Sequence, residues 1–272
     1  MRLLIIGCGA IGAVLAKAAQ DMPEVEAFYL ADKNEARAAA CAKGYPKAAW
    51  IGNDSESLRR TADQVQLVIE AASQEAARDI IPLCLERGRD VMVMSVGALV
   101  DDDFRGRCFW MAREHGARLY VPSGAVGGAD GLRSAAVDGI DEVHLTTTKS
   151  PVSLAGVAYL EEKGIDVGRL EVPTVLYDGP AREAVRLFPR NVNVAATIAL
   201  LGIGFDRTRV TIVCDQATKE NRHELVVRGP SGEIRSETSN VPSPSNPATS
   251  YLAALSAVAA LQRIVRNVWI GI

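Results

Sequence analysis

Along the first 120 residues, short apolar runs alternate with longer segments in which apolar residues recur every three or four positions. Short apolar runs predict buried strands, and the longer period predicts amphipathic helices. The strands are expected at residues 3–6, 25–31, 65–70, 90–94 and 117–121, and the helices at 13–19, 34–43, 54–60, 74–86 and 101–115. Because strands separated by helices pair in parallel, the pattern predicts an α/β fold with a doubly wound parallel sheet.

The pattern changes after residue 123. A helix is expected near residues 129–137, and strands at 142–149, 209–214, 223–228 and 233–238, with a hairpin turn at 229–232. These features predict a second, α+β domain with a mostly antiparallel sheet. Residues 241–247 are expected to form a loop, and residues 249–268 a long apolar helix that packs against the first domain. We therefore expect one domain at residues 1–122, completed by 247–272, and another at residues 123–246.

Composition excludes several classes of protein. The formal net charge is −3 with acids and bases interspersed, which argues against nucleic acid as a partner. No apolar run is long enough to cross a membrane. The apolar N-terminus resembles a signal peptide, but it overlaps a glycine motif that cleavage would destroy, so we expect a soluble, cytoplasmic protein. The five cysteines are scattered, without a CxxC pair or a Cys/His cluster, and predict neither disulfides nor a metal site.

A glycine motif lies between the first predicted strand and the first predicted helix. It comprises Gly7, Cys8, Gly9, Ala10, Ile11 and Gly12, and Asp32 stands twenty positions later, at the end of the second predicted strand. In this context the first glycine permits a tight turn, the second lets the backbone approach a pyrophosphate, and the third lets helix and strand pack closely. The helix N-terminus offers free N–H groups to the phosphates. The first domain is therefore predicted to be a Rossmann domain that binds a dinucleotide.

The acid at position 32 narrows the choice of cofactor. A carboxylate at the end of the second strand accepts hydrogen bonds from the ribose hydroxyls of NAD, whereas the 2′-phosphate of NADP would meet like charge. Lys33 and Arg37 follow closely and offer positive charge to that phosphate. We therefore predict NAD as the cofactor, with NADP as the alternative.

Three histidines are candidates for proton transfer. His115 ends a predicted helix, where an imidazolium suits the helix dipole, and His144 lies within a predicted strand, so both are interpreted as structural. His223 follows a polar run at the entry to a strand of the second domain. Polar groups at such an edge face solvent or a cleft, where an imidazole can move protons near neutrality. His223 is the candidate catalytic residue.

A second polar cluster precedes a predicted apolar helix in the second domain. Asn191 and Asn193 can cap that helix, or they can bind a nicotinamide carboxamide or a substrate carboxylate through their amides. Arg190 and Lys149 are candidate cations for a dicarboxylate substrate.

Together, several segments resemble the L-aspartate dehydrogenases, whose substrate domain is similar to that of homoserine dehydrogenase and dihydrodipicolinate reductase. The segments are PSGA (122–125), TTTK (146–149), FPRNVNVA (188–195), NRHE (221–224) and PSPSNP (242–247). Gly127 and Gly128 depart from the more varied small residues of that family. The resemblance implies NAD(P)-dependent oxidation of L-aspartate to iminoaspartate, which hydrolyses to oxaloacetate and ammonia and feeds NAD synthesis.

The same resemblance implies roles for individual residues. His223 would be the active-site histidine, and Ala125 and Asn191 would contact the nicotinamide cofactor. By analogy with related dehydrogenases, the second domain would also form a homodimer. Two alternatives stay open at this stage: a related dehydrogenase acting on another amino or oxo acid, and an NAD(P)-responsive binding protein without turnover.

Overall fold

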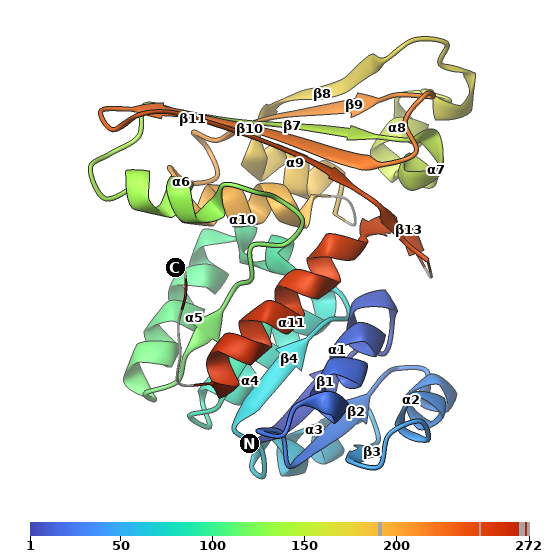
Figure 1. The fold of residues 1–272 in the computed structure, drawn as a ribbon, viewed down its shortest axis with the longest axis vertical. Coiled ribbons are helices and arrows are strands. Elements are labelled where there is room, and N and C mark those ends of the chain that lie inside the picture. The colour runs from blue at the N-terminus through green and yellow to red at the C-terminus, as the bar shows by residue number, and fades with distance from the viewer. Residues whose placement is uncertain (190–191, 245, 267–269, 271–272) are drawn as a thin grey trace. The chain divides into compact units, whose positions relative to one another are not determined.

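The computed structural model describes residues 1–189, 192–244, 246–266 and 270, and divides into two compact units. The first unit comprises Met1–Pro122 with Ala254–Ile270, and the second contains Ser123–Ala253 (Figure 1). Each unit is built on its own sheet. No helix among the described residues is long and apolar enough to cross a membrane.

A six-stranded sheet in the order β3-β2-β1-β4-β5-β6 forms the centre of the first unit, and all of its strands run parallel. The strands are β1 (Arg2–Ile6), β2 (Ala27–Ala31), β3 (Ala48–Trp50), β4 (Leu67–Glu70), β5 (Asp90–Val93) and β6 (Leu119–Tyr120). The strand order reverses between β1 and β4, and ligands of such sheets bind beyond the carboxyl ends of the strands at that point. The predicted doubly wound fold is confirmed, with β3 as a short edge strand that the apolar pattern did not reveal.

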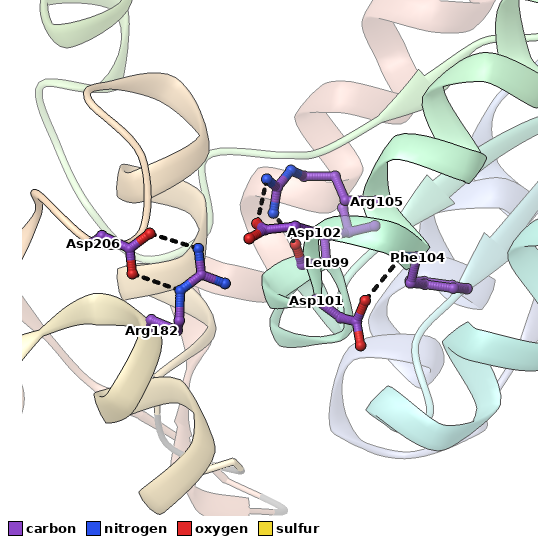
Figure 2. A network of polar contacts seen from close by, with 7 residues as sticks. All are labelled: Leu99, Asp101, Asp102, Phe104, Arg105, Arg182 and Asp206. Carbon is purple, nitrogen blue, oxygen red and sulfur yellow. Dashed lines mark hydrogen bonds and ion pairs between the residues drawn. The ribbon is translucent and has the colours of Figure 1, made fainter.

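Helices connect these strands, and side-chain caps set several of their starts. The helices are α1 (Ala10–Asp21), α2 (Glu35–Ala42), α3 (Ser55–Ala62), α4 (Gln74–Leu85), α5 (Asp102–Glu114) and, at the chain's end, α11 (Tyr251–Val265). Ser73 accepts the Ala76 N–H at the start of α4, and Asp101 accepts the Phe104 N–H at the start of α5 (Figure 2). Such caps satisfy N–H groups that the helix itself leaves unpaired. The 3₁₀ helix η1 (Val96–Val100) precedes α5.

The sheet of the first unit is buried on both faces. Leu3 and Ile5 share one apolar cluster with Leu15 of α1 and with Ala257 and Leu261 of α11. Alternate residues of β1 are buried as well, so the strand presents apolar side chains to both sides. The final helix therefore packs on the first unit, as its apolar spacing predicts.

The second unit contains a five-stranded sheet in the order β11-β10-β7-β9-β8. Its strands are β7 (Glu142–Lys149), β8 (Thr174–Pro180), β9 (Arg209–Cys214), β10 (Asn221–Gly229) and β11 (Gly232–Asn240). Three of the four neighbouring pairs are antiparallel, and β7 with β9 is parallel. The predicted mostly antiparallel sheet is confirmed. Helices α6 (Ala129–Ala135), α9 (Ala181–Leu187) and α10 (Asn193–Leu201) lie along one face of it (Figure 1).

Shorter elements complete the second unit. They are α7 (Pro151–Leu154), α8 (Ala158–Glu162), η2 (Val167–Arg169), β12 (Pro242–Ser243) and β13 (Asn246–Ser250). Within this unit, the Arg182 guanidinium binds both carboxylate oxygens of Asp206 at 2.6 and 2.7 Å (Figure 2). The expected loop at 241–247 is corrected, because Ser243 pairs with Asn246 and Pro242 with Ser250 in a small antiparallel sheet.

Candidate functional site

The turn between β1 and α1 shows why its glycines are needed. Gly7 has a φ of +95°, a conformation that side chains with a Cβ rarely adopt. A Cβ on Gly12 would stand 1.8 Å from the Gly7 carbonyl oxygen, so only glycine allows this close approach of helix and turn. A Cβ on Gly9 would meet nothing within 4 Å, which leaves open space beside the helix N-terminus. This geometry suits a phosphate group bound by the free N–H groups of α1.

Asp32, at the end of β2, organises the same turn. Its carboxylate accepts the Cys8 N–H and the Asn34 N–H, each at 2.8 Å, and Arg37 approaches it at 3.7 Å. The side chain is 6% exposed. Each carboxylate oxygen has further lone pairs beyond these contacts. The Asp32 carboxylate can therefore still accept a hydrogen bond from a hydroxyl group, with the Arg37 guanidinium beside it.

A pocket of about 430 Å³ opens over this turn. Its size falls within the range typical of small-molecule sites. The lining includes Gly7, Gly9, Asp32, Lys33, Asn34, Arg37, Asn53, Ala71, Ala72 and Ser73. Apart from Arg37 of α2, these residues come from segments that follow the carboxyl ends of neighbouring parallel strands, as the strand order predicts. A dinucleotide therefore fits these residues, because Gly9 leaves open space for the phosphates and Asp32 stands where the ribose would bind.

Glu70 supports this pocket and was missed from the sequence. It ends β4, is fully buried, and accepts the N–H groups of Ala72 at 2.8 Å and Ser73 at 3.0 Å through Oε1. It also accepts the Ser95 hydroxyl at 2.9 Å and the Ser95 N–H at 3.0 Å. Burial raises the pKa of Glu70, while these backbone N–H donors oppose the rise. The carboxyl group thus fixes the backbone that lines one wall of the pocket.

In the second unit, one face of the sheet changes from apolar to polar along its strands. Leu145 pairs with Leu225 in register, and two residues further along Thr147 pairs with His223. The neighbouring strand β11 places Thr238 beside His223. Thr147 Oγ1 lies 3.0 Å from His223 Nδ1, and both side chains are 2% exposed. This buried polar end is the candidate reactive part of the second unit.

Lys149 ends β7 at this polar end, two residues beyond Thr147. The side chain is 3% exposed, and its ammonium donates to the Ala248 carbonyl at 3.3 Å. Burial lowers its pKa from the ordinary 10.5 to about 8. Burial, and secondly the positive charge of Lys149, lower the pKa of His223 from the ordinary 6.5 to about 3. The imidazole is therefore neutral throughout the physiological range in the protein without substrate.

These values correct the sequence-based view of His223. The expected position at the entry to the strand is corrected, because β10 begins at Asn221, and His223 is buried inside the sheet rather than facing solvent. The other two histidines lie where expected. His144 Nε2 contacts Thr211 Oγ1 at 2.8 Å, and His115 is the C-terminal cap residue of α5.

The remaining predicted site residues divide into described and undescribed ones. The Ala125 carbonyl accepts the Thr238 hydroxyl at 3.1 Å and the Asn240 amide at 2.9 Å, which fixes it near the polar end of the sheet. Asn193 is the first residue of α10 rather than its cap, because Val192 occupies the cap position. Asn191 and Arg190 lie outside the described residues. Among the residues described, no group of three or more His, Cys, Asp or Glu side chains could hold a metal ion.

Two family models match consecutive parts of the chain, and the second match extends into α11 of the first unit. Residues 7–122 match the family model described as "Homoserine dehydrogenase, NAD binding domain". Residues 130–264 match the model described as "Aspartate dehydrogenase, C-terminal". The first match covers the glycine motif and Asp32, and the second covers Lys149 and His223.

Relatives named L-aspartate dehydrogenase are similar over three quarters of the chain or more. L-aspartate dehydrogenase of Methanosarcina acetivorans is 48% identical, over 100% of this chain and 99% of the relative. L-aspartate dehydrogenase of Serratia proteamaculans is 47% identical over 75% of this chain and 76% of the relative. The crystal structure of aspartate dehydrogenase from Thermotoga maritima is 30% identical, with a TM-score of 0.76 over 100% of this chain and 99% of that one.

Proposed function

The chain belongs to the L-aspartate dehydrogenase family, and from that premise we propose that it oxidises L-aspartate at Cα, with NAD(P) as the hydride acceptor. The observation that supports this most strongly is the burial, on adjacent strands, of a neutral histidine and of a lysine that has no carboxylate partner among the described residues. A neutral base and a cation suit a substrate that carries an amine to deprotonate and two carboxylates to bind.

The overall reaction determines what the protein must do with protons. L-aspartate, the oxidised cofactor and water yield oxaloacetate, ammonium, the reduced cofactor and one proton. When bound, NAD(P) accepts the hydride from Cα. The substrate ammonium must first lose a proton, because its nitrogen lone pair forms the C=N bond as the hydride leaves. Water must then add to the resulting iminoaspartate and lose a proton before ammonia departs.

His223 is the residue we assign to these proton transfers. Thr147 fixes one ring nitrogen, at Nδ1, so Nε2 is the atom available for the substrate amine or for water. The low pKa of His223 makes it a weak base until a negative charge lies nearby. The carboxylates of a bound aspartate supply that charge and raise the imidazole pKa toward the range in which proton transfer is efficient.

The cofactor is assigned to the pocket of the first unit. The residues proposed to hold it there are Gly7, Gly9, Ala10, Ile11, Gly12 and Asp32. The family resemblance implies Ala125 and Asn191 as further cofactor contacts. Asp32 favours NAD, because its carboxylate accepts hydrogen bonds from the ribose hydroxyls. The adjacent Arg37 and Lys33 offer positive charge to the 2′-phosphate of NADP, which is the alternative cofactor. Lys149, Arg190 and Asn193 are the proposed substrate-binding residues.

The assembly and setting are further parts of the proposal. We assign the enzyme to the cytoplasm, because cleavage of the apolar N-terminus would destroy the glycine motif. Its product is assigned to NAD biosynthesis, as the family resemblance implies. The second unit is proposed to form a homodimer, on analogy with related dehydrogenases. Sedimentation at micromolar concentration tests the dimer, and a purely monomeric protein would contradict it.

The decisive assay of function follows reduced-cofactor absorbance with a panel of amino acids at alkaline pH. L-aspartate should give turnover at least about tenfold above D-aspartate, L-homoserine, L-glutamate and L-alanine. Higher turnover with L-homoserine would assign the chain to a related dehydrogenase. Binding of NADH without turnover of any panel member would indicate a binding protein instead.

A further inference from the structure

Lys149 is a buried cation whose surroundings leave its charge uncompensated. Its ammonium can donate three hydrogen bonds, and the Ala248 carbonyl accepts one at 3.3 Å. Within the described part of the chain, no carboxylate lies within ion-pairing distance of it. An ion removed from water in this way is costly unless an opposite charge joins it. The site is therefore incomplete without an anion.

Among the described residues of the neighbouring strands, no side chain provides that anion. In register, Lys149 pairs with Cys214 of β9, and His223 lies on the adjacent strand β10. These are the titratable side chains at neighbouring positions, and neither brings a carboxylate. Asp215 donates its N–H to the Lys149 carbonyl, but its own carboxylate accepts the Ala217 N–H at 2.9 Å. The acid that follows the register partner of Lys149 thus makes its side-chain hydrogen bond within its own loop.

We infer that Lys149 binds a carboxylate of the substrate, and that its charge, once paired with that carboxylate, allows His223 to take up a proton. The inference rests on the proposed function and adds to it the anchor that holds the dicarboxylate beside the imidazole. Before binding, the ammonium repels a proton from His223. A bound carboxylate cancels that repulsion, so substrate binding itself prepares the base. An amino acid without a side-chain carboxylate would supply less negative charge to this pair.

Succinate is a suitable probe, because it carries two carboxylates and no amine to oxidise. Its dissociation constant is measured by calorimetry in the presence of saturating NADH, for the wild type, Lys149→Met and Lys219→Met. Lys219→Met is the matched control, since that lysine is exposed in the same unit. Loss of a charge-assisted hydrogen bond should weaken succinate binding about 10- to 100-fold in Lys149→Met and leave the control unchanged.

Dependence on pH supplies a second readout. Wild-type affinity for succinate should fall about tenfold per pH unit above about pH 8, as free Lys149 loses its proton. Lys149→Met should show no such fall. The variant should also melt at a higher temperature than the wild type, because methionine keeps the side-chain length and removes an uncompensated buried charge.

These measurements separate the inference from the proposed function. Succinate binding through Lys149 in a protein that does not oxidise L-aspartate would support the anchor and contradict the dehydrogenase. Normal aspartate oxidation and succinate binding by Lys149→Met would overturn the anchor and leave the dehydrogenase intact. A lower melting temperature with unchanged succinate binding would also overturn it, by assigning Lys149 a structural role.

Discussion

Replacing His223 with asparagine separates its chemistry from its packing. In the wild type, Thr147 Oγ1 lies 3.0 Å from His223 Nδ1. The asparagine amide can occupy the position of Nδ1 and keep this hydrogen bond. It has no atom at the position of Nε2, which we assign to proton transfer. His223→Asn should therefore fold and bind NADH normally while losing turnover.

The expected loss follows from the role assigned to the imidazole. Proton transfer by a positioned side chain contributes about 10²- to 10⁴-fold, so kcat for L-aspartate should fall within that range. A purely structural contact would instead cost stability: one hydrogen bond to a neutral group contributes only about 1 kcal/mol. The assay is reduced-cofactor absorbance at saturating L-aspartate, with NADH affinity measured by fluorescence.

His144 provides the matched control. It lies in the same sheet, and its Nε2 contacts a threonine hydroxyl at 2.8 Å, so His144→Gln perturbs a similar hydrogen bond away from the polar end. That variant should keep its turnover to within about twofold when folded. A His223→Asn enzyme within a few-fold of the wild type would refute the assignment and move the proton transfer to another group, with Lys149 the first to be tested.

Three further predictions concern the cofactor pocket and stability. Asp32→Ser should raise the KM for NAD and increase relative use of NADP, measured as the ratio of kcat/KM values, because it removes the carboxylate that opposes a 2′-phosphate; an unchanged ratio would contradict this role. Glu70→Gln should lower the free energy of unfolding by about 1–3 kcal/mol and raise the KM for the cofactor. The reason is that the new amide N–H groups would face backbone N–H donors. An unchanged midpoint of denaturation would contradict this role of Glu70. The folded-state pKa of His223 lies below the unfolded one, so the wild type should lose stability relative to His223→Asn as pH falls from about 6.5 toward 3; parallel pH curves of the two proteins would contradict the buried, neutral imidazole.

Much of the fold follows from local patterns. Strand β7 was predicted at its observed bounds because its residues alternate between a buried and a less buried face. Strand β8 was missed, since Pro173 precedes it and Gly179 and Pro180 form its end, and such residues suggest a turn. The small sheet of β12 and β13 was missed for the same reason, because three prolines within residues 242–247 hide a pairing that depends on tertiary contacts.

The candidate site was predictable where chemistry depends on spacing along the chain. Gly7, Gly12 and Asp32 satisfy a rule for one strand–turn–helix unit, so the sequence alone indicates the pocket. Burial of His223 and Lys149 was not predictable, because it depends on which residues two other strands bring beside them. Glu70 carried no recognisable motif: a single acid after an apolar strand acquires its role only when two separate loops donate hydrogen bonds to it.

The central claim, hydride removal from Cα of L-aspartate, is tested most directly with L-aspartate deuterated at that carbon. Mass spectrometry of the reduced cofactor should show one deuterium per molecule formed, together with a slower turnover than with unlabelled substrate if hydride transfer limits the rate. The deuterium should be absent when unlabelled L-aspartate is oxidised in heavy water. Reduced cofactor that carries no deuterium from the labelled substrate, or no reduction at all, would contradict the account.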